Sequence, residues 1–522
     1  MQNNFEPAGG DCLSGIVEEI VFQNVENGFT VLALSVDGEL VSAVGTLPEL
    51  SAGEELDLRG RWDEHNLFGR QFKIEEFERR MPETTAGLLK YLSSGAIKGI
   101  GPKTAVRIIE RFGENSFHVL ENEPERLAVI TGISKEKAVQ ISNEYNKQTA
   151  IRNVMISLER YGIRPMECIA VFKRFGSAAI DIINENPYIL CSAVETIGFE
   201  RAEKISERLP HTPSPHHRLR AGVLHVLRHN THNGHTCVPR SKLFAPCREL
   251  LAADDDTIEI TVDSLLNDKM LVKYDIDGVE FLFLPDMYLH EKNIAERMRS
   301  LMKFPPREIQ TLEKDIDLLE QLDGIQYEGL QKRAIRTAVQ KGMLILTGGP
   351  GTGKTTTVKG ILRLFERQNL EIVLAAPTGR AAKRLSEVTG MEAKTIHRLL
   401  EVAWDDSDRP TFKRDMQNPL TCDVVILDEL SMVDVYLFSS LLTALRFGCR
   451  IILVGDSDQL PPVGAGNVLL DLIKSETIPT VCLTEIFRQA RESLIVMNAH
   501  AIIAGAQPEL HKRDGDFFFM ER

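Results

Sequence analysis

The sequence predicts a chain of several domains, in which a small β-barrel and a helical region precede a parallel α/β domain. Three observations support this prediction. Strand-like runs separated by Asn-Gly and Asp-Gly fall within residues 1–82. Glycines recur at near-constant spacing through residues 83–209, and a glycine-rich turn lies between an apolar run and an amphipathic helix near residue 350. A chain of 522 residues is also too long for one hydrophobic core.

Bulk composition is typical of globular proteins. The chain is 43% hydrophobic and 26% charged, and it has no run of eighteen apolar residues that would predict a membrane span. The N-terminus lacks the basic and apolar segments of a secretion signal, and the eight cysteines form no CxxC pair. These features predict a cytoplasmic protein with no membrane partner. The net charge of −14 argues against a broadly basic surface, so a nucleic-acid partner must be inferred from motifs.

Residues 1–82 are expected to form a small barrel of the oligonucleotide-binding type. Asn27-Gly28 and Asp37-Gly38 are hairpin signals between strand-like runs. The expected strands cover residues 20–25, 29–36, 40–45, 55–62 and 70–77. One interpretation is single-strand binding on aromatic side chains; the favoured alternative makes these aromatics core, because basic residues are sparse before Arg59. The aromatic residues concerned are Phe22, Phe29, Trp62 and Phe68.

The stretch 83–209 is expected to be helical and repeated. Its turn glycines recur at spacings of 33, 30 and 36 residues, at Gly99, Gly132, Gly162 and Gly198. Each turn resembles a helix-hairpin-helix, whose backbone N–H groups bind a DNA phosphate without reading bases. A plain helical hairpin is the alternative for any single copy. One helix is expected over 136–145. The first copy fits best, and its expected DNA-binding residues are Lys98, Gly99, Gly101 and Lys103, with Arg107 nearby.

Residues 210–286 are expected to form a small α+β unit. A helix over 218–229 and a hairpin around Asp277-Gly278 predict a winged-helix-like arrangement. Seven of the thirteen histidines fall between His211 and His235, which leaves a Zn²⁺ site open, but no CxxC pair completes one. A solvated helix that partly faces DNA is favoured. A polar helical linker is expected over 287–322.

The most informative stretch, Gly348 to Thr355, reads GGPGTGKT. An apolar run over 343–346 precedes it and an amphipathic helix over 355–367 follows, so the glycines fall on a strand-to-helix turn that binds phosphate. Lys354 is expected to reach the outer phosphates, and Thr355 to hold Mg²⁺. Gln331 is added because an amide can read the adenine edge. The predicted nucleotide-binding residues are Gln331, Gly349, Pro350, Gly351, Thr352, Gly353, Lys354, Thr355 and Thr356.

Polar residues follow four further expected strands, at 372–376, 424–427, 451–454 and 480–483. Ligands of open α/β sheets lie at the carboxyl ends of such strands. Asp428 would bind Mg²⁺ and Glu429 would polarise the attacking water. Gln459 is placed to sense the terminal phosphate, and Arg488 to neutralise charge on the transferred phosphoryl group.

These motifs carry a family resemblance. The series GGPGTGKTTT, APTGRAAKRLSE, TIHRLL, LDELSMVD, GDSDQLPPVGAGNVL and LTEIFRQ resembles superfamily 1 helicases, and more narrowly the stand-alone RecD-like DNA helicases. The resemblance implies a RecA-like motor over 323–485, ATP and Mg²⁺ as cofactors, and 5′→3′ translocation on single-stranded DNA with unwinding at junctions. It assigns Lys354, Asp428, Glu429, Gln459 and Arg488 to catalysis. It assigns Pro377, Thr378, Arg380, Thr395 and His397 to the DNA strand.

The resemblance implies further features. The insert 400–420 is expected to be the pin that splits the duplex, with Trp404 or Phe412 as its wedge. Residues 486–522 resemble only the start of a second motor domain, so the chain is expected to be truncated, to bind ATP and DNA, and to hydrolyse ATP poorly. A monomer is expected, with a single-strand-binding protein as a candidate partner. The alternatives are a nucleotide-switched DNA-binding module without unwinding activity and a P-loop ATPase of another kind.

Overall fold

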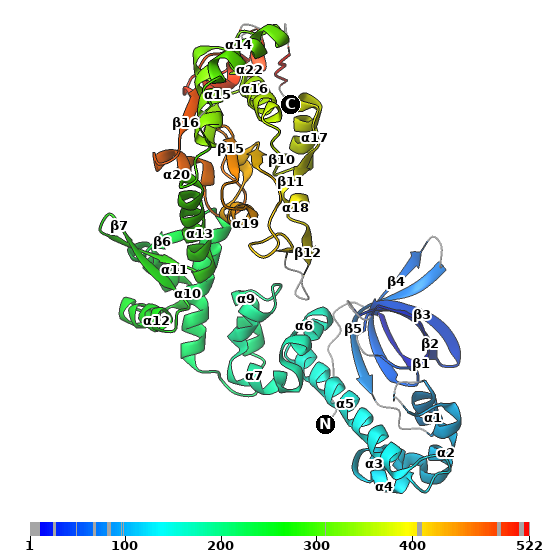
Figure 1. The fold of residues 1–522 in the computed structure, drawn as a ribbon. Helices are drawn as coiled ribbons and strands as arrows, with labels where there is room; N and C mark the ends of the chain where they lie inside the picture. Colours follow the sequence, from blue (N-terminus) through cyan, green and yellow to red (C-terminus); the bar gives the residue numbers. More distant parts are fainter. Residues whose placement is uncertain are drawn as a thin grey trace. The chain divides into compact units, whose positions relative to one another are not determined.

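A computed structural model of the chain (Figure 1) divides into two compact units, residues 1–221 and 222–522, each with its own core. None of the helices within its described residues has the length and apolar character that crossing a membrane requires. The structure describes residues 11–24, 28–47, 50–65, 69–80, 85–94, 97, 99–307, 309–404, 410–487, 492–510 and 516–520.

The first unit begins with a closed barrel of five strands, in the order β1-β2-β3-β5-β4. The strands are β1 (Asp11–Gln23), β2 (Phe29–Val36), β3 (Glu39–Thr46), β4 (Glu55–His65) and β5 (Gly69–Arg80). Asp37 and Gly38 both have positive φ, as the two-residue turn between β2 and β3 requires. Leu32, Leu34 and Phe72 are fully buried inside the barrel. The predicted barrel of the oligonucleotide-binding type is confirmed.

Strand β1 is longer than predicted. It begins at Asp11 rather than near residue 20, because its first half pairs with β4 and its second half pairs with β2. A strand that changes partners midway has no hairpin turn to mark its start. Its length is therefore set by tertiary pairing and not by a local signal.

The aromatic side chains of the barrel do not all lie in its core. The expectation that these aromatic side chains form the core is wrong for Phe22 and Phe29, which are 53% and 40% exposed. Their ring centroids lie 6.4 Å apart. Trp62 is half-buried, with the guanidinium of Arg70 at 4.1 Å from its ring centroid. Phe68 lies outside the described residues.

The helical region repeats a two-hairpin arrangement. Pro102 opens one helix and Pro165 opens its counterpart, and each helix ends at Phe-Gly before a short 3₁₀ turn. The helix predicted to end at residue 145 continues to Arg160, because neither proline nor glycine interrupts it. The helices are α1 (Thr85–Ser93), α2 (Pro102–Phe112), α3 (Ser116–Asn122), α4 (Pro124–Leu127), α5 (Lys135–Arg160), α6 (Pro165–Phe175), α7 (Ala179–Glu185), α8 (Leu190–Ala193) and α9 (Phe199–Ser206).

A small α+β unit follows, in the order helix, strand, two helices and hairpin that is typical of a winged helix. Its elements are α10 (Pro215–His232), β6 (Cys237–Pro239), α11 (Arg240–Leu251), α12 (Asp255–Asn267), β7 (Val272–Ile276) and β8 (Val279–Phe283). The antiparallel sheet has the order β6-β8-β7, with the predicted turn at Asp277-Gly278. Helix α12 is acidic, and its Glu259 and Asp263 bind Arg240. This helix therefore lacks the basic surface that binds DNA phosphates.

The stretch predicted as one polar linker forms two helices, α13 (Pro285–Met302) and α14 (Leu312–Asp323), separated at Pro305-Pro306. Helix α13 belongs to the motor core rather than to a linker. It buries Ile294 and Met298, and its Arg297 donates to the carbonyl oxygen of Leu442 at 3.0 Å. The apolar stripe was masked in the sequence by the charged residues of the other face.

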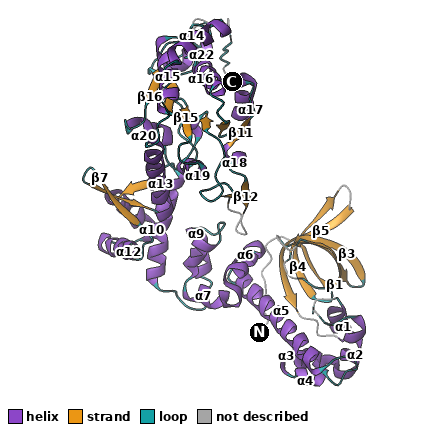
Figure 2. Cartoon of the chain, viewed as in Figure 1, coloured by secondary structure: helices purple, strands orange, loops and turns teal. Residues whose placement is uncertain are grey.

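The motor domain is built on a six-stranded parallel sheet in the order β11-β10-β14-β15-β9-β16. Strands β11, β15 and β16 of this sheet are labelled in Figure 2. Its strands are β9 (Met343–Gly348), β10 (Ile372–Ala376), β11 (Ala393–Thr395), β14 (Val424–Leu427), β15 (Arg450–Val454) and β16 (Thr480–Leu483). One face packs under α13, α18 (Ile396–Leu399), α19 (Val435–Ala444) and α20 (Val468–Lys474). The other face packs under α14, α15 (Gly329–Lys341), α16 (Lys354–Arg367) and α17 (Gly379–Thr389). This arrangement confirms the predicted P-loop motor fold and brings the carboxyl ends of the strands to one edge.

Candidate nucleotide and DNA site

The glycine-rich loop joins β9, which is buried along its whole length, to the first residue of α16. Gly348, Gly351 and Gly353 have φ values of +150°, +76° and +85°, which side chains rarely tolerate. The ammonium of Lys354 donates to the carbonyl oxygens of Gly348 and Gly349, the latter at 3.1 Å. The side chain of Lys354 is therefore held against the backbone of the loop to which it belongs.

The remaining predicted loop residues surround this lysine. Pro350 and Gly351 form the turn, and the buried hydroxyl of Thr352 donates to the carbonyl oxygen of Gly349 at 2.8 Å. Thr355 is exposed and Thr356 is half-buried, both in the first turn of α16. The exposed hydroxyl of Thr355 can therefore act as a metal ligand, because it is not packed in the core.

The predicted acidic pair follows β14 directly. The backbone N–H of Asp428 donates to the carbonyl oxygen of Ala375 in β10 at 2.9 Å, which fixes the pair beside its neighbouring strand. Glu429 has a φ of +54°, although it is not glycine. Such a conformation costs roughly 1–3 kcal/mol and is concentrated at functional sites.

Charge is concentrated around Lys354. Burial lowers the pKa of its ammonium, and the charges of Asp456, Glu429 and Asp428 act in the opposite direction. Burial raises the pKa of Asp428, and burial together with the charge of Asp428 raises the pKa of Glu429. The positive charge of Arg384 in α17 opposes both of these upward pKa shifts without reversing them. A carboxylate cluster around one ammonium is suited to binding a cation with a polyphosphate.

Gln459 lies in the loop after β15, where it was predicted. Its side-chain oxygen accepts a hydrogen bond from the hydroxyl of Ser431 at 3.1 Å. Asp456, 3% exposed, accepts from the backbone N–H of Asp458 at 3.1 Å and orders the same loop. Ser431 and Asp456 were missed, although each lies within four residues of a predicted strand end. Arg488 lies outside the described residues.

Gln331 is placed next to the loop, as expected, but its amide is already used. It is 1% exposed, its nitrogen donates to the carbonyl oxygen of Gly353 at 3.3 Å, and its oxygen accepts from the N–H of Glu328 at 3.0 Å. Reading an adenine with this amide would require an exchange of both bonds. That role stays a prediction.

The residues present are suited to Mg²⁺. Thr355 and Asp428 supply a hydroxyl and a carboxylate, the hard oxygen ligands that this ion prefers. The half-buried carboxyl of Asp428, with its raised pKa, would gain from a cation. Within the described ranges, histidine, cysteine and acidic side chains nowhere gather in threes as a protein-only metal centre requires, and this holds for the described histidines of α10.

The predicted DNA-facing residues of the motor lie at adjacent strand ends. Thr378 caps α17 by accepting from the N–H of Ala381, and Thr395 caps α18 by accepting from the N–H of Arg398, each at 3.2 Å. Parallel pairing of β10 with β11 places these caps at one edge of the sheet. The residues beside them differ in exposure: Pro377 is half-buried, and Arg380 and His397 are exposed.

The expected pin begins as a short hairpin of β12 (Val402–Trp404) and β13 (Pro410–Phe412). Phe412 is half-buried at the base of this hairpin, with its ring centroid 5.9 Å from that of His397 and 5.8 Å from that of Tyr436. The expectation that Phe412 is the wedge is therefore wrong, because its ring anchors the hairpin to the motor. Residues 405–409 and the side chain of Trp404 lie outside the described part.

The hairpin turns of the first unit are braced by arginines. Gly99, Gly101 and Lys103 are exposed, as DNA contact would require, and Lys98 lies outside the described residues. Arg107, predicted as a basic residue near DNA, instead donates to the carbonyl oxygen of Thr131 in the second turn at 2.7 Å. Its positive charge still adds to the local field, but its position is fixed by the neighbouring turn.

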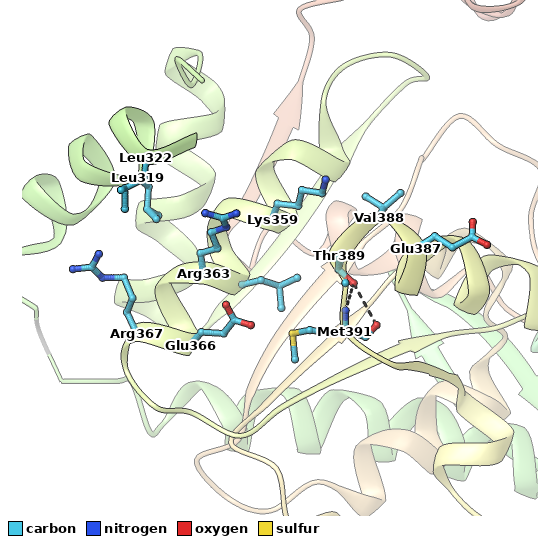
Figure 3. Close-up of a pocket in the computed structure, with 12 residues that line it drawn as sticks. Leu319, Leu322, Lys359, Arg363, Glu366, Arg367, Glu387, Val388, Thr389 and Met391 are labelled. Carbon is cyan, nitrogen blue, oxygen red and sulfur yellow. Dashed lines mark hydrogen bonds between the residues drawn. The ribbon is translucent and has the colours of Figure 1, made fainter. Parts of the chain in front are cut away.

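A separate hollow of about 750 Å³ lies between α14, α16 and α17 (Figure 3). Lys359, Arg363 and Arg367 reach it from α16, and Leu319 and Met391 add apolar surface. None of its lining residues belongs to the glycine-rich loop. It is therefore distinct from the phosphate site, which we identify from the loop geometry.

Family models match most of the chain. They are an OB-fold domain of the ATP-dependent DNA helicase YrrC over residues 11–82, a SAM-like helix-hairpin-helix tandem over 90–147, an ATP-dependent RecD2 DNA helicase HHH domain over 147–237, and an AAA domain over 331–465. These models cover the barrel, the helical repeats and the nucleotide domain in the order observed here.

Similarity along almost the whole of this chain agrees with the domain matches. The ATP-dependent RecD2 DNA helicase of Deinococcus radiodurans is 30% identical over 520 residues, which cover 96% of this chain and 71% of that protein. The RecBCD enzyme subunit RecD of Mycolicibacterium smegmatis is 37% identical over 37% of this chain and 38% of its own length. A Pif1 helicase structure from Candida albicans shares 24% identity over 35% of this chain and 46% of that chain, with a TM-score of 0.26 that is too low to support a conclusion. The domain order and the near-complete match to the first relative show that the chain belongs to the ATP-dependent RecD2 DNA helicase family.

Proposed function

We propose that this chain couples ATP hydrolysis to 5′→3′ movement along single-stranded DNA and so unwinds duplex DNA at junctions. One observation carries the proposal: the phosphate loop, the acidic pair and the caps at Thr378 and Thr395 lie along the same edge of one sheet. A change at the nucleotide is thus transmitted through a single rigid layer to the DNA-facing turns.

The nucleotide roles follow from chemistry. Lys354 binds the outer phosphates, and Glu429 orients and polarises the attacking water. Gln459 senses the terminal phosphate, and Arg488 stabilises charge on the transferred group. Thr355 and Asp428 would hold Mg²⁺, which when bound neutralises phosphate charge.

The DNA roles divide by unit. In the motor domain, Thr378, Arg380 and His397, with Pro377 and Thr395, contact the single strand. In the first unit, the turn at Gly99 and Gly101 with Lys98 and Lys103 binds phosphates without base readout. The exposed rings of Phe22 and Phe29 also favour stacking of bases on the barrel.

Strand displacement tests the proposal. The whole chain with ATP is expected to displace a strand from a duplex with a 5′ single-stranded tail and not from one with a 3′ tail, at the low rate that its expected poor hydrolysis allows. Lys354→Ala should abolish this activity, because it removes the phosphate contact. Displacement from the 3′-tailed duplex would contradict the polarity. Nucleotide-dependent DNA affinity without displacement would favour a nucleotide-switched binding module instead.

A further inference from the structure

The segment that follows β16 folds back onto the glycine-rich loop. The backbone N–H of Phe487 donates to the carbonyl oxygen of Gly351 at 3.2 Å. Further along, helix α22 (Leu494–Ile503) places the imidazole Nε2 of His500 at 3.0 Å from the carbonyl oxygen of Pro350. Two residues of this segment, Phe487 and His500, therefore contact the loop. His500 has no role in the mechanism proposed above.

The loop is shaped to receive the imidazole. A Cβ atom at Gly349 would meet three atoms of the His500 ring, the nearest at 2.6 Å. Gly349 does not have a positive φ, so its backbone conformation alone does not require glycine. The absence of a side chain at Gly349 is instead explained by the close approach of the His500 ring.

Helix α22 is fixed in place at its start. The carboxylate of Asp516 accepts from the backbone N–H of Leu494 at 2.9 Å and from the hydroxyl of Ser493. Asn498, 5% exposed, donates to the carbonyl oxygen of Glu509 at 3.3 Å and accepts from its N–H at 2.8 Å. His500 is two residues beyond this buried amide, so its ring is presented by an anchored helix.

The contact lies at the outer-phosphate end of the loop. The ammonium of Lys354, which in such loops reaches the β- and γ-phosphates, lies against Gly348 and Gly349. Gln331 and Phe487 approach the opposite end, at Gly353. His500 therefore adjoins the part of the loop that a triphosphate uses more fully than a diphosphate.

We propose that His500 is a positioning residue for the terminal phosphate of bound ATP. Its N–H donates to Pro350 and holds the outer turn of the loop in the conformation that Lys354 needs to bind that phosphate. This inference rests on the proposed use of ATP at this loop. Its consequence is selective: loss of the hydrogen bond weakens the binding of a triphosphate more than that of a diphosphate.

Two substitutions separate hydrogen bonding from packing. His500→Gln keeps an N–H donor, whereas His500→Phe keeps a ring and removes the donor. We would measure dissociation constants for a fluorescent non-hydrolysable ATP analogue and for fluorescent ADP, using the whole chain. His500→Phe is expected to weaken analogue binding about fivefold and ADP binding less than twofold, the effect of one hydrogen bond. His500→Gln is expected to restore analogue binding to within about twofold of the unaltered chain.

The controls separate this inference from the proposed function. Met497→Ala, an exposed site on the same helix, should bind both nucleotides normally. Equal losses for both nucleotides in His500→Phe, or no loss at all, would overturn the role of His500 while leaving the ATP site intact. Failure of the unaltered chain to bind either nucleotide, as expected for Lys354→Ala, would overturn the proposed function as well.

Discussion

The hydroxyl of Ser431 donates a hydrogen bond to the side-chain oxygen of Gln459 across 3.1 Å. Ser431 follows the acidic pair at the end of β14 and is 5% exposed, whereas Gln459 is exposed in the loop after β15. The bond occupies the side-chain oxygen of Gln459, so the proposed contact with phosphate falls to its side-chain nitrogen. A buried serine thus orients an exposed amide.

Ser431→Ala is therefore expected to slow ATP hydrolysis about fivefold, the effect of one hydrogen bond, while leaving nucleotide affinity within about twofold. The rate falls because Gln459 loses the bond that fixes its amide, and affinity persists because the loop and Lys354 are unchanged. Steady-state hydrolysis and ADP binding measure the two effects. Ser440→Ala, which removes an ordinary helix hydroxyl bond to Tyr436, is the matched control. A parallel loss of affinity and rate would show that Ser431 supports the loop instead.

Glu429→Gln is expected to abolish hydrolysis, to keep nucleotide binding, and to raise the free energy of unfolding at neutral pH. Burial and the charge of Asp428 raise the pKa of Glu429 above its ordinary 4.5 in the folded protein. The folded state then binds this proton more tightly than the unfolded state, so ionisation at neutral pH destabilises the fold. Glutamine removes that charge and its cost.

The sign of this effect gives its pH dependence. In the unaltered chain the destabilisation is present above the raised pKa and disappears as pH falls through it toward 4.5. The stability gain of Glu429→Gln should therefore be larger at pH 7.5 than near pH 5. Thermal unfolding measures this gain, in the transition that ADP shifts, because that transition belongs to the unit with the nucleotide site. Glu387→Gln, on the exposed surface of α17, should show no such trend. A gain that does not change with pH would point to altered packing.

The motor sheet was predictable because its signals are local. Each predicted strand is a short apolar run that ends in polar residues, and parallel pairing brings those ends to one edge. Lys354, Asp428, Glu429 and Gln459 could be placed for that reason. Strand β11 was missed because three residues carry no periodicity.

Other features depend on contacts between distant residues. Ser431 acts through a residue in the loop after another strand, and His500 acts through a loop 150 positions away. Ser431 lies within the quoted LDELSMVD motif, but nothing near it in the sequence marks Gln459 as its partner, and His500 lies in none of the quoted motifs. Phe412 was a wedge candidate because the family resemblance implies that its insert is the pin, but its packing is set by Tyr436 and His397.

Phe412→Ala is expected to reduce strand displacement several-fold while DNA-stimulated ATP hydrolysis stays near normal. The ring joins the base of the β12–β13 hairpin to Tyr436, so its loss leaves the hairpin poorly anchored, whereas the phosphate site is untouched. Gel-based displacement and hydrolysis on the same DNA measure the two activities. Tyr436→Phe, which keeps the ring contact, should behave normally. Equal loss of both activities would place Phe412 in the DNA path.

Arg201→Ala is expected to destabilise the first unit by roughly 3–5 kcal/mol, because it leaves a buried charge unpaired. The guanidinium of Arg201 donates to the carboxylate of Glu167 at 2.6 Å and to the carbonyl oxygen of Gly162 at 3.3 Å. The side chain of Glu167 is only 4% exposed. Denaturant unfolding of the whole chain measures the loss. The transition that ADP does not shift is the one to follow, because it belongs to the unit without the nucleotide site.

Arg107→Ala is the matched control for this prediction. Arg107 braces the other hairpin pair in the same way, through the carbonyl oxygen of Thr131, but it leaves no buried carboxylate behind. Its loss should cost about 1 kcal/mol, the value of one exposed hydrogen bond. The double variant Arg201→Leu with Glu167→Leu should recover much of the stability lost in Arg201→Ala, since it removes both charges. If the two single arginine variants were equally destabilised, the backbone brace, and not the buried charge, would account for the stability of these turns.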